Sequence, residues 1–319
     1  MNKQIVIACD LGGTNLRTAA IDREGNILYR TRRDTPQTER AEEILFALAE
    51  SANECRENVK GLGKVLAIAV AAPAIVNSEK GVILKAPNVP ALDNFPFAKT
   101  IEAVLNQRCF LENDANAAAV GESWLGASKN FQNSIYITLG TGVGGGIIIA
   151  GKILRGIDGT AAEIGHVCVE PFGASCGCGS RGCLEQYSSA KAIVRLTGEI
   201  ARDYPNSDLA NNKSLTALEI YKAGKAGDAL AVEVFRRQGF YLGIGLAGLI
   251  NVLNPEVIVI GGGAASGWDL FEPEMIEQIR FRAYRKPAER ARIIRAECGD
   301  DAGILGAARI AFENLQSQQ

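Results

Sequence analysis

The sequence predicts an α/β protein of two domains built on one plan. Near its start, Ile5–Cys9, Arg17–Ile21 and Ile27–Arg32 read as a strand meander whose first turn is rich in glycine and threonine. The pattern returns at Ser134–Leu139 and Ile147–Ala150, again around such a turn. This coarse internal repeat indicates two α/β domains with a cleft between them.

The remaining segments fit the same architecture. Apolar residues at helical spacing predict helices over Ala41–Val59, Phe97–Leu105 and Ala115–Leu125. Apolar runs predict strands at Val65–Ala71, Cys109–Glu112, Lys152–Arg155 and Val257–Ile260. A last helix over Ala302–Leu315 is expected to pack back on the first domain. We therefore expect a small domain of residues 1–114 with 302–319, and a large domain of residues 115–301.

Composition favours a cytoplasmic protein. Apolar residues make up 47% of the 319, enough for a substantial core, and the net charge of −2 favours neither nucleic acid nor a membrane surface. The apolar run at Ile5–Cys9 is too short for a signal peptide, and no apolar stretch reaches transmembrane length. Five cysteines lie mostly in apolar runs and are expected to be reduced: Cys9, Cys55, Cys109, Cys168 and Cys298.

One histidine and three cysteines have the spacing of a metal site. His166, Cys176, Cys178 and Cys183 form His-x9-Cys-x-Cys-x4-Cys, and His166 is the only histidine of the chain. Four such ligands fill a tetrahedral zinc site and leave no position for a catalytic water, so the zinc would be structural. Unrelated free thiols or a disulfide are the alternatives; cysteine clusters in the cytosol favour metal. Glutamates at 163 and 185 bracket the cluster and suggest a polar binding site.

Two glycine-rich turns are candidate phosphate sites. Asp10–Thr14 follows a buried strand, and its consecutive N–H groups can bind an anion while Asp10 holds a metal ion; a plain hairpin turn is the alternative. Gly140–Gly146 contains Gly-x-Gly-x-x-Gly, but a strand follows where a dinucleotide fold needs a helix. A Rossmann site is therefore excluded, and no Walker loop exists. Two facing turns would clamp a phosphate chain from both sides.

Three further segments have two interpretations each. Asn113-Asp114 precedes an alanine-rich helix, where it can cap the helix, supply Asp114 as a general base for phosphoryl transfer, or do both. Gly261–Gly263 follows a strand and either admits a flat ligand or forms an ordinary loop. A basic tract is typical of a solvated helix face, although it can attract phosphates. Its members are Arg280, Arg282, Arg285, Lys286, Arg290, Arg292 and Arg295.

Together these motifs resemble the ROK family (repressors, open reading frames and sugar kinases), most closely its bacterial glucokinases. The resemblance runs nearly end to end. It rests on Asp10–Thr14, Asn113-Asp114, Gly140–Gly146, Glu163–His166 and Cys176–Glu185, of which the last two together are highly specific. It implies an actin-like, hexokinase-like (ribonuclease H-like) fold, in which two α/β domains close over sugar and ATP.

The resemblance also implies roles for single residues. Asp114 would be the base that deprotonates the sugar 6-hydroxyl. The sugar hydroxyls would be bound by Asn88, Asn113, Glu163, His166 and Glu185. The phosphates and Mg²⁺ of ATP would lie against Asp10, Gly12, Gly13, Thr14, Gly140, Thr141, Gly142 and Gly144. The adenosine would pack on Gly262 and Gly263, and His166 would serve both zinc and sugar through its two ring nitrogens.

The resemblance leaves alternatives open. Family members often carry Pro-Gly where this chain has Pro73-Ala74, in a loop near the sugar, so the sugar could be N-acetylglucosamine, N-acetylmannosamine, mannose, fructose or allose instead of glucose. Polyphosphate could replace ATP. A sugar-responsive regulator is a further alternative, but Asp10 begins the first turn so early that no room is left for a preceding DNA-binding helix-turn-helix. The family implies a homodimer.

Overall fold

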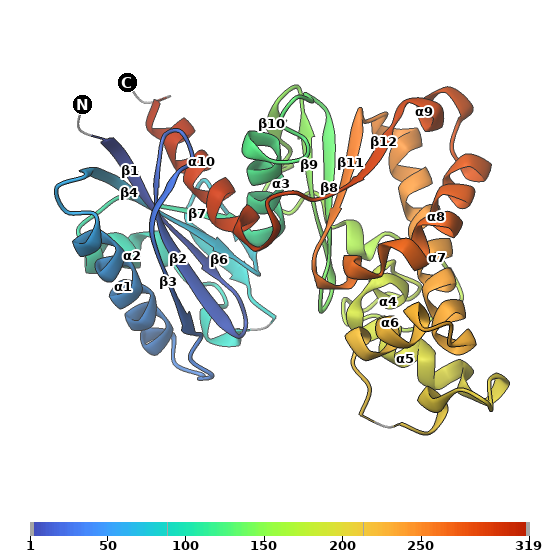
Figure 1. Cartoon of the computed structure of the whole chain (residues 1–319). Helices are drawn as coiled ribbons and strands as arrows, with labels where there is room; N and C mark the ends of the chain where they lie inside the picture. Colours follow the sequence, from blue (N-terminus) through green and yellow to red (C-terminus); the bar gives the residue numbers. More distant parts are fainter. Residues whose placement is uncertain (1–2, 88, 213, 317–319) are drawn as a thin grey trace. The chain divides into compact units, whose positions relative to one another are not determined.

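The computed structural model describes residues 3–87, 89–212 and 214–316 of the chain. Its contacts divide the chain into two compact units (Figure 1). Unit 1 consists of Met1–Gln132, Gly146–Ala162 and Glu297–Gln319, and unit 2 consists of Asn133–Gly145 and Glu163–Ala296. This division groups the helix after Asn113 with the first unit. The domain bounds expected from the sequence, 1–114 with 302–319 and 115–301, stay a prediction.

Unit 1 is built on a five-stranded sheet in the order β3-β2-β1-β4-β7. Its strands are β1 (Lys3–Leu11), β2 (Asn15–Asp22), β3 (Ile27–Asp34), β4 (Gly63–Ala72) and β7 (Cys109–Asn113). The first three form an antiparallel meander, while β4 runs parallel to β1 and β7 parallel to β4. A separate hairpin of β5 (Ile75–Asn77) and β6 (Val82–Lys85) lies between β4 and β7 in the chain, and a 3₁₀ turn, η1 (Pro90–Leu92), follows it.

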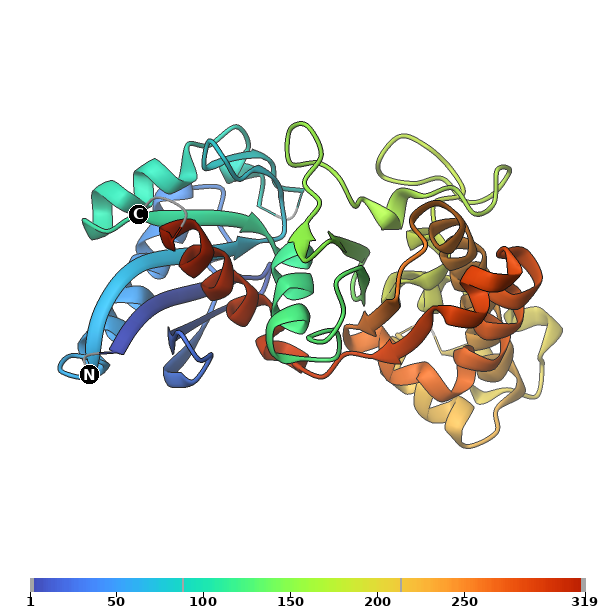
Figure 2. The same cartoon turned by 90° about the horizontal axis from the view of Figure 1, so that it is seen from above.

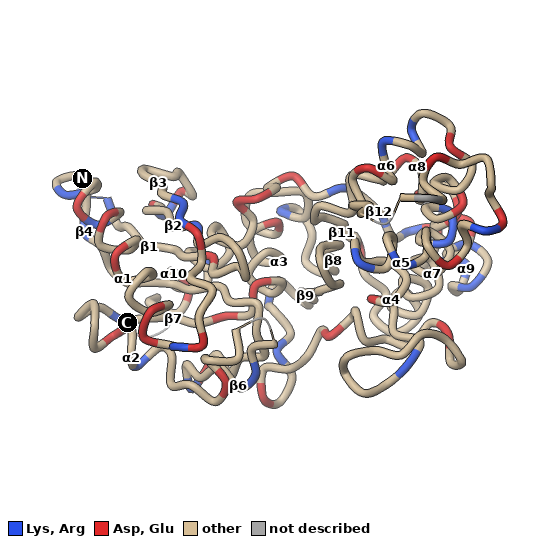
Figure 3. The backbone as a smooth tube through the Cα atoms, turned by 90° about the horizontal axis from the view of Figure 1, so that it is seen from below, with Lys and Arg blue, Asp and Glu red and all other residues tan. Residues whose placement is uncertain are grey.

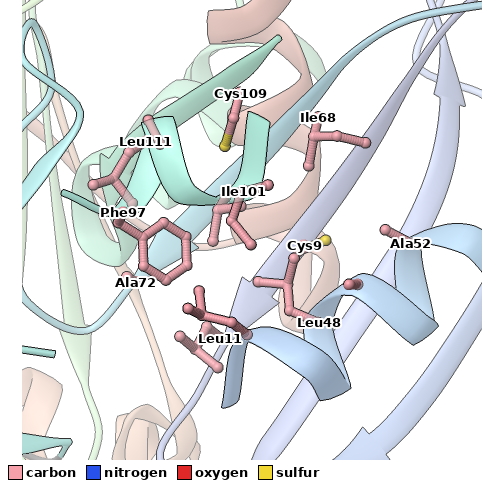
Figure 4. Close-up of a cluster of buried hydrophobic side chains, with 14 of the residues drawn as sticks. Cys9, Leu11, Leu48, Ala52, Ile68, Ala72, Phe97, Ile101, Cys109 and Leu111 are labelled. Carbon is pink, nitrogen blue, oxygen red and sulfur yellow. The ribbon is translucent and has the colours of Figure 1, made fainter. Parts of the chain in front are cut away.

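Strand β1 is buried on both faces, because alternate residues of a strand point to opposite sides of the sheet. Ile5, Ile7 and Cys9 join one apolar cluster together with residues of α1 (Ala41–Asn58) and α2 (Phe97–Leu105) (Figure 4). Val6 and Ala8 join a second cluster together with residues of α10 (Ala302–Gln316). The C-terminal helix therefore covers the face of this sheet opposite α1, as expected from its sequence.

Helix α3 (Asp114–Leu125) packs on α10 within the same unit through small residues. A Cβ atom on Gly306 would lie 1.6 Å from the carbonyl oxygen of Ala117, and one on Gly121 would lie 2.2 Å from that of Ala302. The two helix backbones thus approach so closely that only glycine fits at both positions. Between these helices in the chain, η6 (Gly299–Asp301) leads into α10.

Unit 2 contains most of a second five-stranded sheet, ordered β10-β9-β8-β11-β12. Strands β8 (Ser134–Leu139) and β12 (Arg292–Arg295) run parallel to β11 (Val257–Gly261). The division between units falls within β9 (Val143–Ile149), and β10 (Lys152–Ile153) belongs to unit 1. Both sheets have the order third, second, first, fourth, fifth, which confirms the predicted repeat of one plan.

The α-helices of unit 2 all follow Cys183 in the chain (Figure 2). They are α4 (Glu185–Ser188), α5 (Ala190–Ile200), α6 (Ala217–Lys225), α7 (Ala229–Leu253), α8 (Trp268–Arg282) and α9 (Arg285–Arg290), with 3₁₀ turns η2 (Ile164–His166), η3 (Ala201–Asp203), η4 (Asp208–Asn211) and η5 (Gly263–Gly267). Helix α7 crosses α8 closely, since a Cβ on Gly239 would lie 2.2 Å from the Phe271 carbonyl oxygen. This pair supplies much of the apolar interior of the unit.

Three predictions need correction. The third strand of the second meander ends at Ile153 rather than Arg155, because the chain leaves the sheet after two pairs of ladder partners. The predicted turn over Gly140–Gly146 is limited to Gly140–Gly142, since β9 already begins at Val143. The seven cations of the basic tract are exposed, but they belong to α8, α9 and β12 rather than to one helix face.

Charges of both signs are interspersed along both units (Figure 3). Within the described residues, no helix combines the length and apolar character that crossing a bilayer requires. The eight cysteines are all unpaired, and five of them are buried.

Replacing Gly306 by Ala should destabilise the protein by about 1–3 kcal/mol, because the added methyl group overlaps the Ala117 carbonyl of α3. Gly248→Ala in α7 is the matched control. That position is exposed with nothing within 4 Å of an added Cβ, so alanine should stabilise by about 0.5–1 kcal/mol. Urea unfolding midpoints of both variants check this, and a stable Gly306→Ala would contradict the close approach of α3 and α10.

Candidate active site

In the turn between β1 and β2, the carbonyl groups of Gly12, Gly13 and Thr14 accept hydrogen bonds from Thr35 and Gln37. Thr35 donates from Oγ1 to the Gly12 oxygen at 2.7 Å and from its N–H to the Thr14 oxygen at 2.8 Å, while Gln37 donates to the Gly13 oxygen at 2.8 Å. No described residue accepts a hydrogen bond from the N–H of Gly13 or Thr14. Such N–H groups suit an anion. A pocket of about 240 Å³ adjoins Gly13 and is lined by Thr35 to Glu39.

Asp10 precedes this turn and is only weakly paired. Its Oδ2 lies 3.5 Å from Nη1 of Arg17, and the same guanidinium reaches Asp300 at 3.0 Å. Gly303 of α10 faces the carboxylate, at 3.4 Å from an added Cβ. Burial raises the pKa of Asp10, and Arg17 opposes part of that rise. Sequence reasoning missed Arg17, which only the antiparallel pairing of Asp10 with residue 17 brings opposite it.

Asn113 and Asp114 lie where β7 ends and α3 begins. Asn113 is the N-cap of the helix, since its Oδ1 accepts from the N–H of Asn116 at 3.0 Å, and its Nδ2 donates to the Ala74 oxygen at 3.1 Å. Asp114 Oδ1 accepts from the N–H of Ala115 at 2.8 Å. Capping is therefore confirmed for Asn113. Ala74, the departure from the family pattern, is buried against this same junction.

The turn of unit 2 is fixed by Glu185. Gly140 donates to the Gly142 oxygen at 2.9 Å, and Val143 donates to Glu185 Oε2 at 3.0 Å. A Cβ on Gly142 would lie 2.3 Å from that carboxylate oxygen, so a larger residue there would displace the Glu185 side chain. Thr141 is exposed at the tip, and Gly144 lies inside β9. The hydrogen bond from Val143 thus holds the turn against Glu185.

The four predicted metal ligands converge. Their donor atoms all lie within 4.8 Å of one another in unit 2. The Cys178 and Cys183 sulfurs are 3.7 Å apart, and the Cys176 sulfur is 3.6 Å from Nδ1 of His166. Tetrahedral zinc with bonds of about 2.3 Å to sulfur and 2.0–2.1 Å to nitrogen requires separations of roughly 3.8 and 3.6 Å. The residues fit the ion, and the sulfur separation excludes a disulfide between Cys178 and Cys183.

The backbone of the metal loop folds into a tight knuckle. Cys176 donates to the Ser180 oxygen at 2.8 Å, and Gly179 donates back to the Cys176 oxygen at 3.0 Å. Gly182 has a φ of 71°, and a Cβ there would lie 1.7 Å from the Glu170 oxygen. Glycine therefore lets the loop close on itself and bring its sulfurs together.

Glu163, a predicted sugar ligand, lies beside His166 of the candidate metal cluster. His166 turns Nδ1 toward the sulfurs, and its Nε2 lies 4.0 Å from Glu163 Oε2. Partial removal from water raises the pKa of the Glu163 carboxyl; His166 opposes this shift, whereas Glu185 adds to it. Glu163, His166 and Glu185 are thus neighbours within unit 2. Asn88 lies outside the described residues.

Gly262 and Gly263 differ in what they require. Gly262 has a φ of 87°, and a Cβ there would lie 2.5 Å from the Leu139 oxygen at the end of β8. Gly263 begins η5 and has nothing within 4 Å of an added Cβ. Close packing on Leu139 explains why residue 262 is glycine. At Gly263 the space around an added Cβ is open.

A family model for the ROK family matches residues 6–314. The chain belongs to the ROK family. Its sequence is 34% identical over 319 residues to a glucokinase of Thermotoga maritima, covering 99% of both chains. The crystal structure of a ROK family glucokinase from Streptomyces griseus, in complex with glucose and AMPPNP, matches with a TM-score of 0.82 and 34% identity over 97% of this chain and 99% of that one.

A ROK family transcriptional regulator, a homolog of the E. coli MLC protein, has the same fold. It matches with a TM-score of 0.88 and 30% identity, over 97% of this chain and 78% of that chain. These likenesses confirm the predicted α/β, actin-like fold. The fold is thus shared by kinases and regulators, and the function rests on the site.

The pKa of Asp10 predicts a pH-dependent effect on stability. A carboxyl whose folded pKa lies above its unfolded value of about 3.9 stabilises the fold only while it is protonated, and loses this contribution as the pH rises through the folded pKa. Asp10→Asn should therefore raise the unfolding temperature near pH 7, and the gain should shrink as the pH falls toward about 4. Thermal melts across this range check it.

Asp300→Asn is the control, because it removes an exposed carboxylate that shares the same arginine. It should shift the unfolding temperature little at any pH. An Asp10→Asn variant less stable than the wild type at pH 7 would mean that the carboxylate is held in a favourable environment.

Proposed function

We propose that this protein is an ATP-dependent hexokinase that phosphorylates the 6-hydroxyl of a hexose, with glucose as its main substrate. The observation that carries the proposal is an aspartate, Asp114, at the start of a capped helix in a chain 34% identical to a glucokinase along its whole length. Glucose and a nucleotide analogue are what the similar Streptomyces griseus enzyme binds. ATP and its Mg²⁺ follow from the same relatives.

Asp114 is the proposed general base. Its carboxylate would accept the proton of the 6-hydroxyl while that oxygen attacks the γ-phosphorus, and the bond from the γ-phosphorus to the β,γ-bridging oxygen would break to release ADP. Two features of the site support this role. The N-terminus of α3 stabilises negative charge, and the hydrogen bond from Ala115 orients the carboxylate.

The sugar would be bound by residues from three segments of the sequence. Asn113 is fixed by its cap bond and by Ala74, so its amide has one orientation. Glu163, His166 and Glu185 would hold further hydroxyls, and Asn88 is proposed as a fifth ligand from its sequence position alone. Because His166 directs Nδ1 to the sulfurs, Nε2 is the nitrogen that suits a hydroxyl.

Structural zinc is proposed for His166, Cys176, Cys178 and Cys183. The ion would hold the loop and supply no reacting group, since four protein ligands complete its coordination. Through Glu185, the same loop contacts the turn at Gly142 and Val143. Zinc would thus order a sugar ligand and a phosphate turn together.

The phosphates of ATP are proposed to lie along two turns. In unit 1 these are Gly12, Gly13 and Thr14, with Asp10 directed to Mg²⁺ or its waters. In unit 2 they are Gly140, Thr141, Gly142 and Gly144, and the adenosine would rest on Gly262 and Gly263. We further propose the domain division at Asp114, a homodimer and a cytoplasmic location, the last supported by eight unpaired cysteines.

A sugar-responsive regulator is the second candidate, supported by the TM-score of 0.88 to a ROK regulator. A gel-shift assay with genomic DNA fragments, with and without glucose, separates it from a kinase. Within the kinases, ratios of kcat/KM decide the sugar among glucose, mannose, fructose, allose and the N-acetylated hexosamines. Polyphosphate in place of ATP tests the donor in the same assay.

Asp114→Asn should lower kcat for glucose phosphorylation by about 10²–10⁴-fold, because the amide cannot accept the hydroxyl proton. The KM for ATP should change little. An assay coupled to oxidation of glucose 6-phosphate measures both constants. Asp203→Asn, which replaces an exposed aspartate of η3, should keep wild-type turnover. Near-normal kcat in folded Asp114→Asn would refute the base assignment.

Cys178→Ser should lose zinc, lower the unfolding temperature and weaken glucose binding, because a tetrahedral site with three strong ligands no longer holds the loop. Metal analysis and calorimetric titration with glucose measure these effects. Cys168→Ser is the matched control, since Cys168 is an exposed cysteine of the same segment outside the four ligands. If metal-free protein binds glucose with unchanged affinity, the zinc stabilises the fold without shaping the sugar site.

A further inference from the structure

A buried carboxylate lies directly before the proposed catalytic pair. Glu112 is the fourth residue of β7, and its side chain is only 2% exposed. Its Oε2 accepts a hydrogen bond from Arg155 Nε at 2.8 Å, and Nη2 of the same guanidinium lies 2.7 Å from Oε2 in an ion pair. A buried carboxylate needs a counter-charge and hydrogen-bond donors around it. Neither residue is explained by the sequence motifs of the family.

The second oxygen of Glu112 connects three segments. Oε1 accepts from Ser78 Oγ at 3.1 Å, from the N–H of Asn113 at 3.1 Å and from Asn116 Nδ2 at 3.2 Å. Ser78 follows β5, Asn113 is the cap of α3, and Asn116 lies in the first turn of α3. One oxygen therefore sets the spacing between the hairpin, the end of β7 and the start of the helix.

Asn116 links the Glu112 carboxylate to the junction between β7 and α3. It is 2% exposed, and its N–H donates to the cap oxygen of Asn113 while its Nδ2 donates to Glu112. An ionised carboxylate can only accept, so the amide of Asn116 must present its nitrogen. The helix start and the buried charge therefore fix each other.

Arg155 belongs to a loop that is itself held in place. Its carbonyl oxygen accepts from the N–H of Ala161 at 3.2 Å, which closes the loop 155–161. Gly159, with a φ of 93°, lies so close to β5 that an added Cβ would be 2.3 Å from the Val76 oxygen. The arginine side chain is 32% exposed, so solvent reaches it although the carboxylate is buried.

We propose that Glu112 and Arg155 are a positioning pair for phosphoryl transfer. Arg155 orients the Glu112 carboxylate, and Glu112 in turn fixes the backbone from which Asn113 and Asp114 project. Neither residue contacts substrate. The inference rests on the proposed function, because it assigns Asp114 as the base and Asn113 as a sugar ligand. Displacing such groups by about 1 Å costs roughly 10²-fold in rate.

The test compares kcat and KM per folded molecule in Arg155→Ala, Arg155→Lys and Glu112→Gln. We expect Arg155→Ala to lower kcat about tenfold or more and to raise the KM for glucose, with the KM for ATP within about twofold. Guanidinium ions at sub-denaturing concentration should restore part of kcat, because they can enter the partly exposed arginine site. Sodium ions at the same ionic strength should not.

Arg33→Ala is the matched control. Arg33 is 35% exposed, close to the exposure of Arg155, and it pairs with Glu54 at 2.7 Å in the same unit. This variant loses that ion pair and a second one with Glu50 at 3.1 Å without touching β7, so its kcat should stay at the wild-type value. A general loss of stability from removing an arginine would appear in both variants.

Wild-type kcat in folded Arg155→Ala, or a loss that guanidinium leaves unchanged, would overturn the proposal. If Arg155→Ala does not fold, the same readouts apply to Arg155→Lys, which keeps the charge but loses the two-nitrogen contact, and to Glu112→Gln. Failure of the proposed function is separate. Retained turnover in Asp114→Asn would refute the proposed function. An inactive Asp114→Asn variant, together with unimpaired Arg155→Ala and Glu112→Gln variants, would refute only the positioning pair.

Discussion

The register of the parallel strands determines where each candidate functional residue can lie. In unit 1, Asp10 of β1 pairs with Ala71 of β4, and Ala71 pairs with Glu112 of β7. The ends of β1 and β7 therefore emerge at one edge of the sheet, two strand spacings or roughly 10 Å apart. In unit 2, Thr138 of β8 pairs with Gly261 of β11, so the two glycine loops follow neighbouring strands. Ligand sites of α/β sheets form at such carboxyl edges. A slip of register in either sheet would separate the phosphate turn from the residues beside it.

Sequence patterns could predict the features that depend on local periodicity or close spacing. The apolar run Ile5–Cys9 lies inside β1, and the candidate metal ligands from Cys176 to Cys183 meet because one short loop carries three of them. Contacts between distant segments could not be predicted. Glu112 and Arg155 are 43 residues apart, and a single glutamate in a strand gives no sign of its partner. The extent of the turn at Gly140 was overestimated for a related reason, because glycines inside β9 are required by close packing rather than by a turn. Gly146 is an example, because an added Cβ there would lie 2.5 Å from the Ala119 Cβ.

The metal loop and the turn of unit 2 form one continuous network. Glu185 lies two residues after Cys183, the last candidate metal ligand, and accepts from Val143, while Ala190 donates to the Gly140 oxygen at 2.8 Å. From the other side, Gly165 lies against Val143, where an added Cβ would be 2.1 Å from its carbonyl oxygen. A ligand that fixes the loop thus also restrains the turn. This extends the role expected for zinc from framing the sugar ligands to ordering the proposed phosphate site as well.

Two carboxylates at the same sheet edge have opposite environments, and the contrast separates their roles. Glu112 accepts four hydrogen bonds, one of them from the Arg155 guanidinium, which also forms an ion pair with it at 2.7 Å. Asp10 has only a long contact to Arg17, which Asp300 shares, and its pKa is raised by burial. A protein gains nothing in stability from a buried carboxylate left in this state. A cation that arrives with a nucleotide would supply the positive charge that Asp10 lacks, so the environment of Asp10 supports a metal-binding role. The hydrogen bonds of Glu112 support a fixed position for that carboxylate.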